Sequence, residues 1–142
     1  MSAYADTSFL VSLYIADANS ISAATIAASA ELPLITSVLG ELEITNAFAL
    51  RMFRKELKAS ELRRAEAAFR TDLEEGVLSI RPVTAAVYEK AQLIAQRRTP
   101  RLGTRTLDIL HVASALALEA EVFYTFDKNQ RKLARTEGLK AA

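Results

Sequence analysis

Four carboxylates, in four separate parts of the chain, stand among otherwise apolar neighbours. They are Asp6, Glu43, Asp108 and Asp127. Carboxylates that gather at one place repel one another, and they then bind protons or a divalent cation. Hard oxygen ligands favour Mg²⁺ or Mn²⁺ over zinc, and the chain has no Cys and a single His. Such a metal activates water and clamps phosphate oxygens, so these residues indicate phosphodiester hydrolysis.

Most of these acids also have a purely structural interpretation. Asp6 and Asp127 are good helix N-caps, and Asp108 could simply balance a helix dipole from the first turn. Glu43 is different, because it lies in the middle of a predicted helix, where capping offers no explanation. The hypothesis of a metal site therefore rests on the set of four and not on any one acid.

The segment Thr106–Leu118 is apolar almost all the way round a helix, which predicts a central helix covered on most sides. An ionised Asp108 in such surroundings is costly unless a cation or several donors meet it. The preceding segment, 97–105, is predicted to be a loop, and it carries Arg97, Arg98, Arg101 and Arg105. Such a loop could grip a substrate near a metal, or it could serve only as a connection.

Short apolar segments alternate with helical patterns along the whole chain. Strands are expected at 3–5, 34–36, 77–80 and 122–125, and helices at 7–14, 19–29, 38–53, 60–75, 84–98, 106–118 and 127–137. This alternation predicts a single α/β domain with a mainly parallel sheet flanked by helices. The length of 142 residues and the hydrophobic content of 51% suit one core. Ligands bind outside the carboxyl ends of such strands, where Asp6 and Asp127 fall.

The helix predicted at 38–53 carries two apolar stripes. One contains Leu39, Glu43, Asn46, Leu50 and Phe53, and the opposite one contains Ile44, Phe48 and Met52. One stripe is expected to pack on the core and the other to contact a partner. We assign the partner interface to Ile44, Phe48 and Met52.

Charge and hydropathy exclude several classes of protein. The net charge of +1 argues against a surface coated in basic residues for nonspecific nucleic-acid binding. No segment reaches the roughly 20 apolar residues of a membrane span, and no Lys or Arg precedes the apolar run at 9–16. The absence of Cys permits a reducing compartment. We therefore expect a soluble cytoplasmic protein without a membrane partner.

Four short motifs resemble, in order and spacing, those of PIN-domain ribonucleases of the VapC toxin type. They are YADTS at 4–8, TS at 36–37 with Glu43 and Asn46 following, TLDILH at 106–111 and TFD at 125–127. The resemblance covers nearly the whole chain. It implies a Mg²⁺- or Mn²⁺-dependent endoribonuclease that cleaves RNA, is inhibited by a cognate antitoxin and forms a homodimer.

Carried over by position, the resemblance implies that Asp6, Glu43, Asp108 and Asp127 are catalytic metal-site acids, supported by Thr7, Asn46 and Thr125. Two features depart from the pattern. Residues 138–142 leave little chain for the fifth strand of such domains, so a sheet of four to five strands is expected. Glu41 also competes with Glu43, which we prefer because its stripe carries Asn46.

Basic residues near these acids could contact substrate phosphates. Arg105 precedes Asp108, and the last helix has a basic strip that begins beside Asp127; from these we select Arg105, Lys128 and Arg131. The alternative is an ordinary solvated helix face. His111 is interpreted as a hydrogen-bonded core residue, because metal-activated water needs no histidine base.

Two other functions stay open at this point. The first is a catalytically inactive binding module whose acids grip Arg or Lys side chains of a partner. The second is a structure-specific DNA nuclease of similar architecture. The motifs of phosphate-binding loops, dinucleotide-binding folds and serine hydrolases are absent.

Overall fold

The computed structural model describes residues 1–142, and its centre is a parallel sheet of five strands. The strands are β1 (Ala3–Ala5), β2 (Leu34–Ser37), β3 (Leu78–Arg81), β4 (Val122–Tyr124) and β5 (Lys140–Ala141). Their order across the sheet is β3-β2-β1-β4-β5, and every neighbouring pair is parallel. The predicted α/β class is confirmed. The last residues do form a fifth strand, in which Lys140 pairs with Val122 and Ala141 with Phe123.

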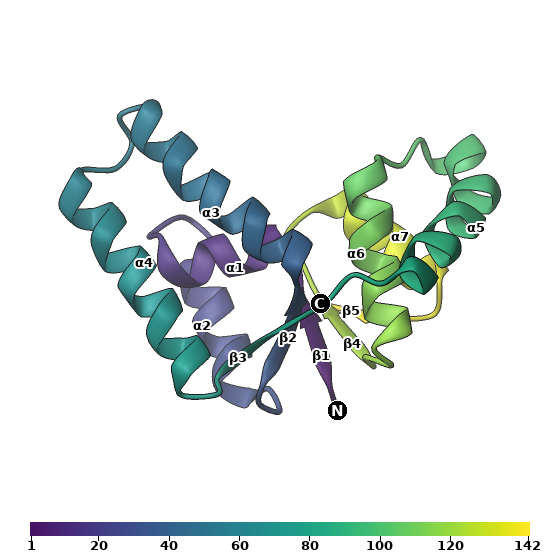
Figure 1. Cartoon of the computed structure of the whole chain (residues 1–142), viewed down its shortest axis with the longest axis horizontal. Helices are drawn as coiled ribbons and strands as arrows, with labels where there is room; N and C mark the ends of the chain where they lie inside the picture. The colour runs from purple at the N-terminus through teal and green to yellow at the C-terminus, as the bar shows by residue number, and fades with distance from the viewer.

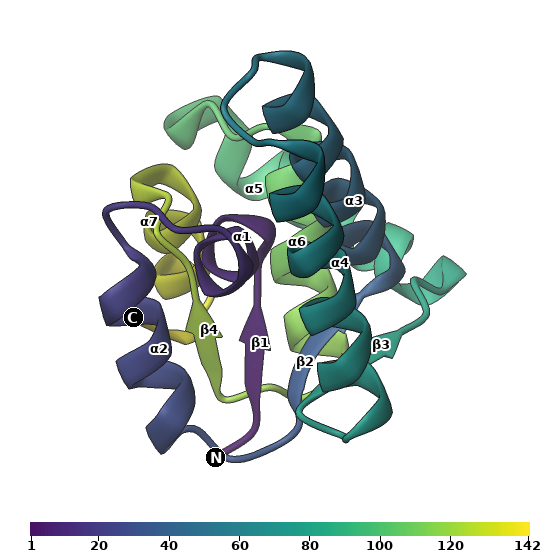
Figure 2. The ribbon, with the colours of Figure 1, turned by 90° about the vertical axis from the view of Figure 1, so that its left-hand side faces the viewer.

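Seven helices cover the two faces of this sheet. Helices α1 (Thr7–Tyr14), α2 (Ser20–Ser29), α3 (Val38–Phe53) and α4 (Ala59–Glu74) lie on one side, and α5 (Ala85–Leu102), α6 (Thr106–Ala117) and α7 (Lys128–Thr136) on the other (Figure 1). Successive strand residues face opposite sides. Ala3 and Ala5 therefore join the core beneath α1–α4, while Tyr4 joins the core beneath α5–α7. Figure 2, viewed from the α1–α4 side, shows β1 leading directly into α1.

Helix α6 is the covered central helix that its composition predicts. All residues from Ile109 to Ala115 are buried, and α6 packs between α5 and α7. The predicted cap of α3 is also present, because Ser37 Oγ accepts a hydrogen bond of 3.3 Å from the backbone N–H of Gly40. These two helices, α3 and α6, approach the same end of the sheet from opposite faces (Figure 1).

The predicted arginine loop is wrong over most of its length. Helix α5 continues to Leu102 and includes Pro100 in its last turn. Gly103 ends it in the left-handed region at φ 62°, with its N–H bonded to the carbonyl of Thr99. Proline has no N–H for the carbonyl of the residue four positions earlier, and its ring crowds that carbonyl, so α5 continues past Pro100 against the local preference of this residue. Of the four arginines in this segment, only Arg105 lies in the short connection between α5 and α6.

The predicted partner interface on α3 is also wrong for two of its three residues. Ile44 and Phe48 are 1% and 2% exposed and belong to the core beneath α1 and α4, while Met52 is exposed. The opposite stripe is the more open one, and Phe53 is 82% exposed on it. Periodicity identifies two apolar stripes but not which of them the rest of the fold covers. None of the helices is long and apolar enough to cross a membrane.

Candidate active site

The four predicted acids approach one another at the carboxyl end of the central strands. Asp6 follows β1 directly, and Asp127 lies three residues beyond the end of β4. Glu43 comes from the second turn of α3, and Asp108 from the first turn of α6. The order of the strands reverses at β1, and parallel sheets bind their ligands at such a point. Thr125 and Arg105 link Asp6, Asp127 and Asp108 to one another, while Glu43 is bound separately by Thr7 and His111.

Asp6 is the most buried of the four, at 4% exposure. Its Oδ1 accepts hydrogen bonds from Ser8 Oγ at 2.7 Å and from the N–H of Phe9 at 3.1 Å, so it caps α1. Its Oδ2 accepts a hydrogen bond of 2.5 Å from Thr125 Oγ1. Burial raises the pKa of Asp6 above its ordinary value, and the hydrogen bonds from Thr125 and Ser8 only partly oppose this. A cation near Asp6 would therefore stabilise its ionised form.

Thr125 joins Asp6 to Asp127. Besides donating to Asp6, its hydroxyl oxygen accepts a hydrogen bond of 3.0 Å from the backbone N–H of Asp127. Asp127 in turn caps α7, because its Oδ1 accepts a hydrogen bond of 2.9 Å from the N–H of Gln130. The capping role therefore uses one carboxylate oxygen of Asp127 and leaves the other directed to the site.

Arg105 lies between two of the acids. Its Nε donates to Asp108 Oδ2 at 3.2 Å, and one of its terminal nitrogens is 3.6 Å from Asp127 Oδ2. Asp108 and Asp127 raise the pKa of this guanidinium further above its already high value. Arg105 is thus the partner that Asp108 was expected to have. The Arg105 side chain is 72% exposed, so the two acids contact only its guanidinium group.

Glu43 is bound from two sides at the same oxygen. Thr7 Oγ1 donates to Glu43 Oε1 at 2.7 Å, and His111 Nε2 forms a short hydrogen bond with that atom. Burial alone would raise the pKa of Glu43, but His111, Thr7 and the charge of Arg105 outweigh it and lower the pKa. Glu43 is therefore held in its ionised form.

His111 belongs to this site, which the sequence interpretation did not anticipate. It is 3% exposed, and its Nδ1 lies 2.7 Å from the hydroxyl of Tyr4, which also bonds Ser37 Oγ at 2.9 Å. The expectation of a hydrogen-bonded, buried histidine is confirmed. Its contact with Glu43 was missed, because one lies on α6 and the other on α3. The available signal was the spacing of three residues between Asp108 and His111, which places both on one side of α6.

Other predicted site residues lie nearby but outside this network. Asn46 is exposed and, together with Glu43 and Thr7, lines a cleft of about 510 Å³ beside α3. Lys128 is exposed at the start of α7. The guanidinium of Arg131 instead bonds the carbonyl oxygen of Thr125 at 2.8 Å. Arg131 therefore supports the end of β4.

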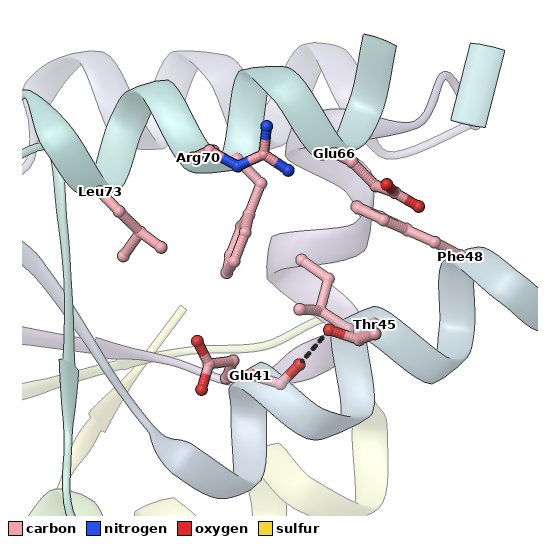
Figure 3. Close-up of a pocket in the computed structure, with 8 residues that line it drawn as sticks. Glu41, Thr45, Phe48, Glu66, Arg70 and Leu73 are labelled. Carbon is pink, nitrogen blue, oxygen red and sulfur yellow. Dashed lines mark hydrogen bonds between the residues drawn. The ribbon is translucent and has the colours of Figure 1, made fainter. Parts of the chain in front are cut away.

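Glu41, the competing acid of α3, lies away from the other carboxylates. It lines a separate pocket of about 320 Å³ between α3 and α4, together with Ile44, Phe48 and Arg70 (Figure 3). Its backbone carbonyl accepts a hydrogen bond of 2.9 Å from Thr45 Oγ1, drawn as a dashed line in Figure 3. The preference for Glu43 thus agrees with the positions of the two side chains.

The donor set suits a hard divalent cation. All four side chains offer oxygen, and Glu43 Oε2 and Asp127 Oδ2 accept no hydrogen bond. No three Asp, Glu or His side chains are gathered as closely as the ligands of a bound metal would be. The Arg105 guanidinium instead supplies the positive charge between Asp108 and Asp127. A cation would take over that role, and the metal itself stays a prediction.

Comparison with known proteins agrees with this architecture. The crystal structure of VapC20 of Mycobacterium tuberculosis, described as a toxin that cleaves the sarcin–ricin loop, superposes with a TM-score of 0.71 at 23% identity, over 97% of this chain and 96% of that one. The structure of FitAcB from Neisseria gonorrhoeae gives a TM-score of 0.69 at 16% identity, over 98% and 95% of the two chains. A toxin–antitoxin complex from Klebsiella pneumoniae gives 0.63 at 16%, over 89% and 87%. These likenesses show a shared fold.

At the level of sequence, a search of curated proteins found no match. The family model of the PIN domain, in contrast, matches residues 3–136, which include all five carboxylates discussed above and every strand except β5. This match spans nearly the whole chain, so the protein belongs to the PIN-domain family.

Proposed function

We propose that this protein is a Mg²⁺- or Mn²⁺-dependent endoribonuclease and the toxin of a toxin–antitoxin pair. One observation carries the proposal: Asp6, Asp108 and Asp127, from three distant segments, are linked into one network at the carboxyl end of β1 and β4, and Thr7, which follows Asp6 in the chain, donates a hydrogen bond to Glu43. Thr125 connects Asp6 to Asp127, and Arg105 connects Asp127 to Asp108. Membership of the PIN-domain family supports a nuclease activity at this place.

Asp6, Glu43, Asp108 and Asp127 would hold the metal, which when bound supplies an activated water and neutralises phosphate charge. The rest of the chemistry follows from this chain's own side chains. Ser8, Phe9 and Thr125 fix the carboxylate of Asp6 in one orientation. Fixed acids cost little reorganisation when charge develops on the phosphate.

Arg105 would bind substrate. Its exposed guanidinium is held only by two carboxylates, and a cation at those carboxylates would release it. A phosphate of the RNA backbone is the natural next partner, because arginine forms paired hydrogen bonds with phosphate oxygens. Lys128, exposed at the start of α7 beside Asp127, would add a second positive charge on the same side.

The proposed partners follow from the neighbours and from the surface of α3. One of the similar structures is a toxin–antitoxin complex, and another is described as a toxin that cleaves the sarcin–ricin loop. On this open side of α3, the exposed Leu42 and Leu50 line the same cleft as Glu43, and Phe53 is exposed at the end of the helix. We propose a cognate antitoxin as inhibitor, a homodimer as the assembly and the cytoplasm as the location.

The test uses the two glutamates of α3 as a matched pair. The parent protein should cleave single-stranded RNA with Mg²⁺ or Mn²⁺ and lose this activity in EDTA. Glu43→Gln and Asp108→Asn should each reduce the rate by about 100-fold or more, as loss of an active-site group does. Glu41→Gln should retain the parent rate, because Glu41 lies in the separate pocket.

Several outcomes would contradict the proposal. Cleavage that persists in EDTA, or an equal loss in Glu41→Gln and Glu43→Gln, would exclude the metal site described here. Preferential cleavage of DNA in a competition assay would replace the ribonuclease with a DNA nuclease. No cleavage of either nucleic acid under any divalent cation would indicate a binding module. In that case the acids would bind an arginine or lysine of a partner, as Asp108 and Asp127 bind Arg105 within this chain.

A further inference from the structure

We infer that His111 is a positioning residue for the metal site: together with Thr7 it ties down one oxygen of Glu43 and leaves the other free for the cation. This inference rests on the proposed function, because it concerns the same site. It departs from the ordinary interpretation of a lone buried histidine as part of the core. Three observations support it.

The first observation is that a hydrogen bond to a buried tyrosine fixes the orientation of the His111 ring. Its Nδ1 meets the hydroxyl of Tyr4 at 2.7 Å, and that hydroxyl bonds Ser37 Oγ at 2.9 Å. Tyr4 is fully buried and stacks on Phe123, with ring centroids 5.5 Å apart and planes 12° from parallel. The rings of Tyr4 and His111 therefore cannot change orientation without disturbing the packing of the core. The orientation of His111 is therefore set by β1, β2 and β4.

The second observation concerns which oxygen of Glu43 is bound. A carboxylate only accepts hydrogen bonds, so Nε2 of His111 carries the proton that is shared with Glu43. Thr7 donates to the same atom, Oε1, while Oε2 receives no hydrogen bond from the protein. Two donors on one oxygen fix the rotation of the carboxylate. The other oxygen keeps its lone pairs for a further ligand, and Glu43 is one of the residues that line the open cleft beside α3.

The third observation is the spacing along α6. Arg105, Asp108 and His111 follow one another at intervals of three residues, so they lie along one side of the start of this helix. Asp108 is an expected metal ligand, and His111 holds another one, Glu43, which comes from α3. Helix α6 therefore sets the distance between two ligands through a rigid contact. Hydrogen-bonding partners of metal ligands act in this way in metal sites generally.

The experiment measures Mn²⁺ binding by calorimetry on the purified full chain. His111→Leu removes both ring nitrogens and should weaken Mn²⁺ binding by about 10-fold or more, as loss of such a partner does. His111→Gln keeps an N–H donor near the position of Nε2 and should recover most of the affinity. Ser114→Ala is the matched control, because Ser114 is buried one turn further along α6 and its hydroxyl has no partner. It should bind Mn²⁺ as the parent does.

A second variant covers the case in which His111→Leu does not fold, as judged by circular dichroism. Tyr4→Phe keeps the buried ring and removes only the hydroxyl that orients His111, so it should weaken Mn²⁺ binding less, by about threefold. A folded His111→Leu, or a folded Tyr4→Phe, that binds Mn²⁺ like the parent would overturn the inference. So would a loss of thermal stability with unchanged Mn²⁺ affinity, which is what a purely structural histidine predicts.

The two proposals can fail separately. A parent protein that binds Mn²⁺ with the expected dependence on His111 but cleaves no RNA would remove the proposed function and leave this inference standing. A parent that cleaves RNA while the His111 variants keep their Mn²⁺ affinity would do the reverse. A parent that binds no Mn²⁺ would overturn both.

Discussion

The hydroxyl of Thr125 donates a hydrogen bond of 2.5 Å to Oδ2 of Asp6, across 119 positions of sequence. Both side chains are buried, so this contact joins the carboxyl ends of β1 and β4 inside the protein. It does not fully compensate the carboxylate, because burial still raises the pKa of Asp6. The fold therefore disfavours the ionised form of Asp6.

We expect Asp6→Asn to stabilise the metal-free protein at neutral pH. A raised pKa in the folded state means that Asp6 favours folding while it is protonated. That stability is present below its ordinary pKa of 3.8 and is lost as the pH rises through the folded value. In EDTA at pH 7, urea unfolding of Asp6→Asn should show a gain of about 1 kcal/mol over the parent. The gain should shrink toward pH 3.5.

Added Mn²⁺ should reverse this ranking, since the parent gains binding energy that Asp6→Asn lacks. The exposed substitution Glu66→Gln should change neither curve. If Asp6→Asn proved less stable than the parent at pH 7 in EDTA, the burial of Asp6 would not carry the cost inferred here.

Arg105→Gln should bind Mn²⁺ more tightly than the parent. The guanidinium now neutralises Asp108 and Asp127, and a cation must displace it. Its removal should raise the Mn²⁺ affinity by about threefold or more at low salt, with a smaller effect at high salt because the side chain is exposed. The same variant should bind RNA more weakly. Calorimetry would measure Mn²⁺ binding, and filter binding would measure RNA binding. Arg101→Gln, at an exposed arginine, is the control. A lower Mn²⁺ affinity in Arg105→Gln would contradict the displacement of Arg105 by the cation.

Much of the site could be predicted from sequence because each acid stands next to a local signal. Asp6 and Asp127 follow short apolar segments and cap the helices that come next, which puts both at the carboxyl end of a parallel sheet. Asp108 lies in the first turn of a helix that is apolar almost all round, so the sequence itself predicts that its carboxylate needs a cation or hydrogen-bond donors. Local periodicity and capping were therefore enough to place three of the four acids.

What could not be predicted depends on contacts between distant segments. The bond of His111 to Glu43 requires knowing that α3 and α6 meet above the same end of the sheet. The burial of Ile44 and Phe48 depends on α4, which packs on one of two stripes that look alike in sequence. The extension of α5 to Leu102 overrides the local preference of Pro100. In each case tertiary packing outweighs local propensity.

Gly40→Ala should destabilise the protein, although alanine favours helices. A Cβ at position 40 would lie 2.2 Å from Thr36 Oγ1, and Thr36 is fully buried at the end of β2. We expect a loss of about 1–3 kcal/mol in urea unfolding, as overpacking a core costs. Thr36→Ala with Gly40→Ala should recover most of this, because the clashing hydroxyl is gone and has no hydrogen bond to lose. A stable Gly40→Ala single variant would show that Thr36 moves aside freely.

Glu137→Gln should loosen the last turns of α5, whose presence the sequence did not predict. The Glu137 side chain is 6% exposed and accepts hydrogen bonds from Arg97 at 2.7 Å and from Arg98 at 2.6 Å. Arg98 also bonds the carbonyl of Thr136, so these contacts fasten α5 to the end of α7. Removing one partner of a buried ion pair costs about 3–5 kcal/mol, but both arginines are partly solvated, which reduces the expected loss to about 1–2 kcal/mol.

Urea unfolding would measure that loss, and hydrogen exchange would locate it. The amides of residues 97–99, 101 and 102 should exchange faster in Glu137→Gln than in the parent, whereas those of the buried helix α6 should follow only the global change in stability. Glu89→Gln is the control, because Glu89 is exposed on α5 and forms no ion pair. Unchanged exchange of these amides would mean that the helical hydrogen bonds alone, without the ion pairs of Glu137, maintain α5 beyond Pro100.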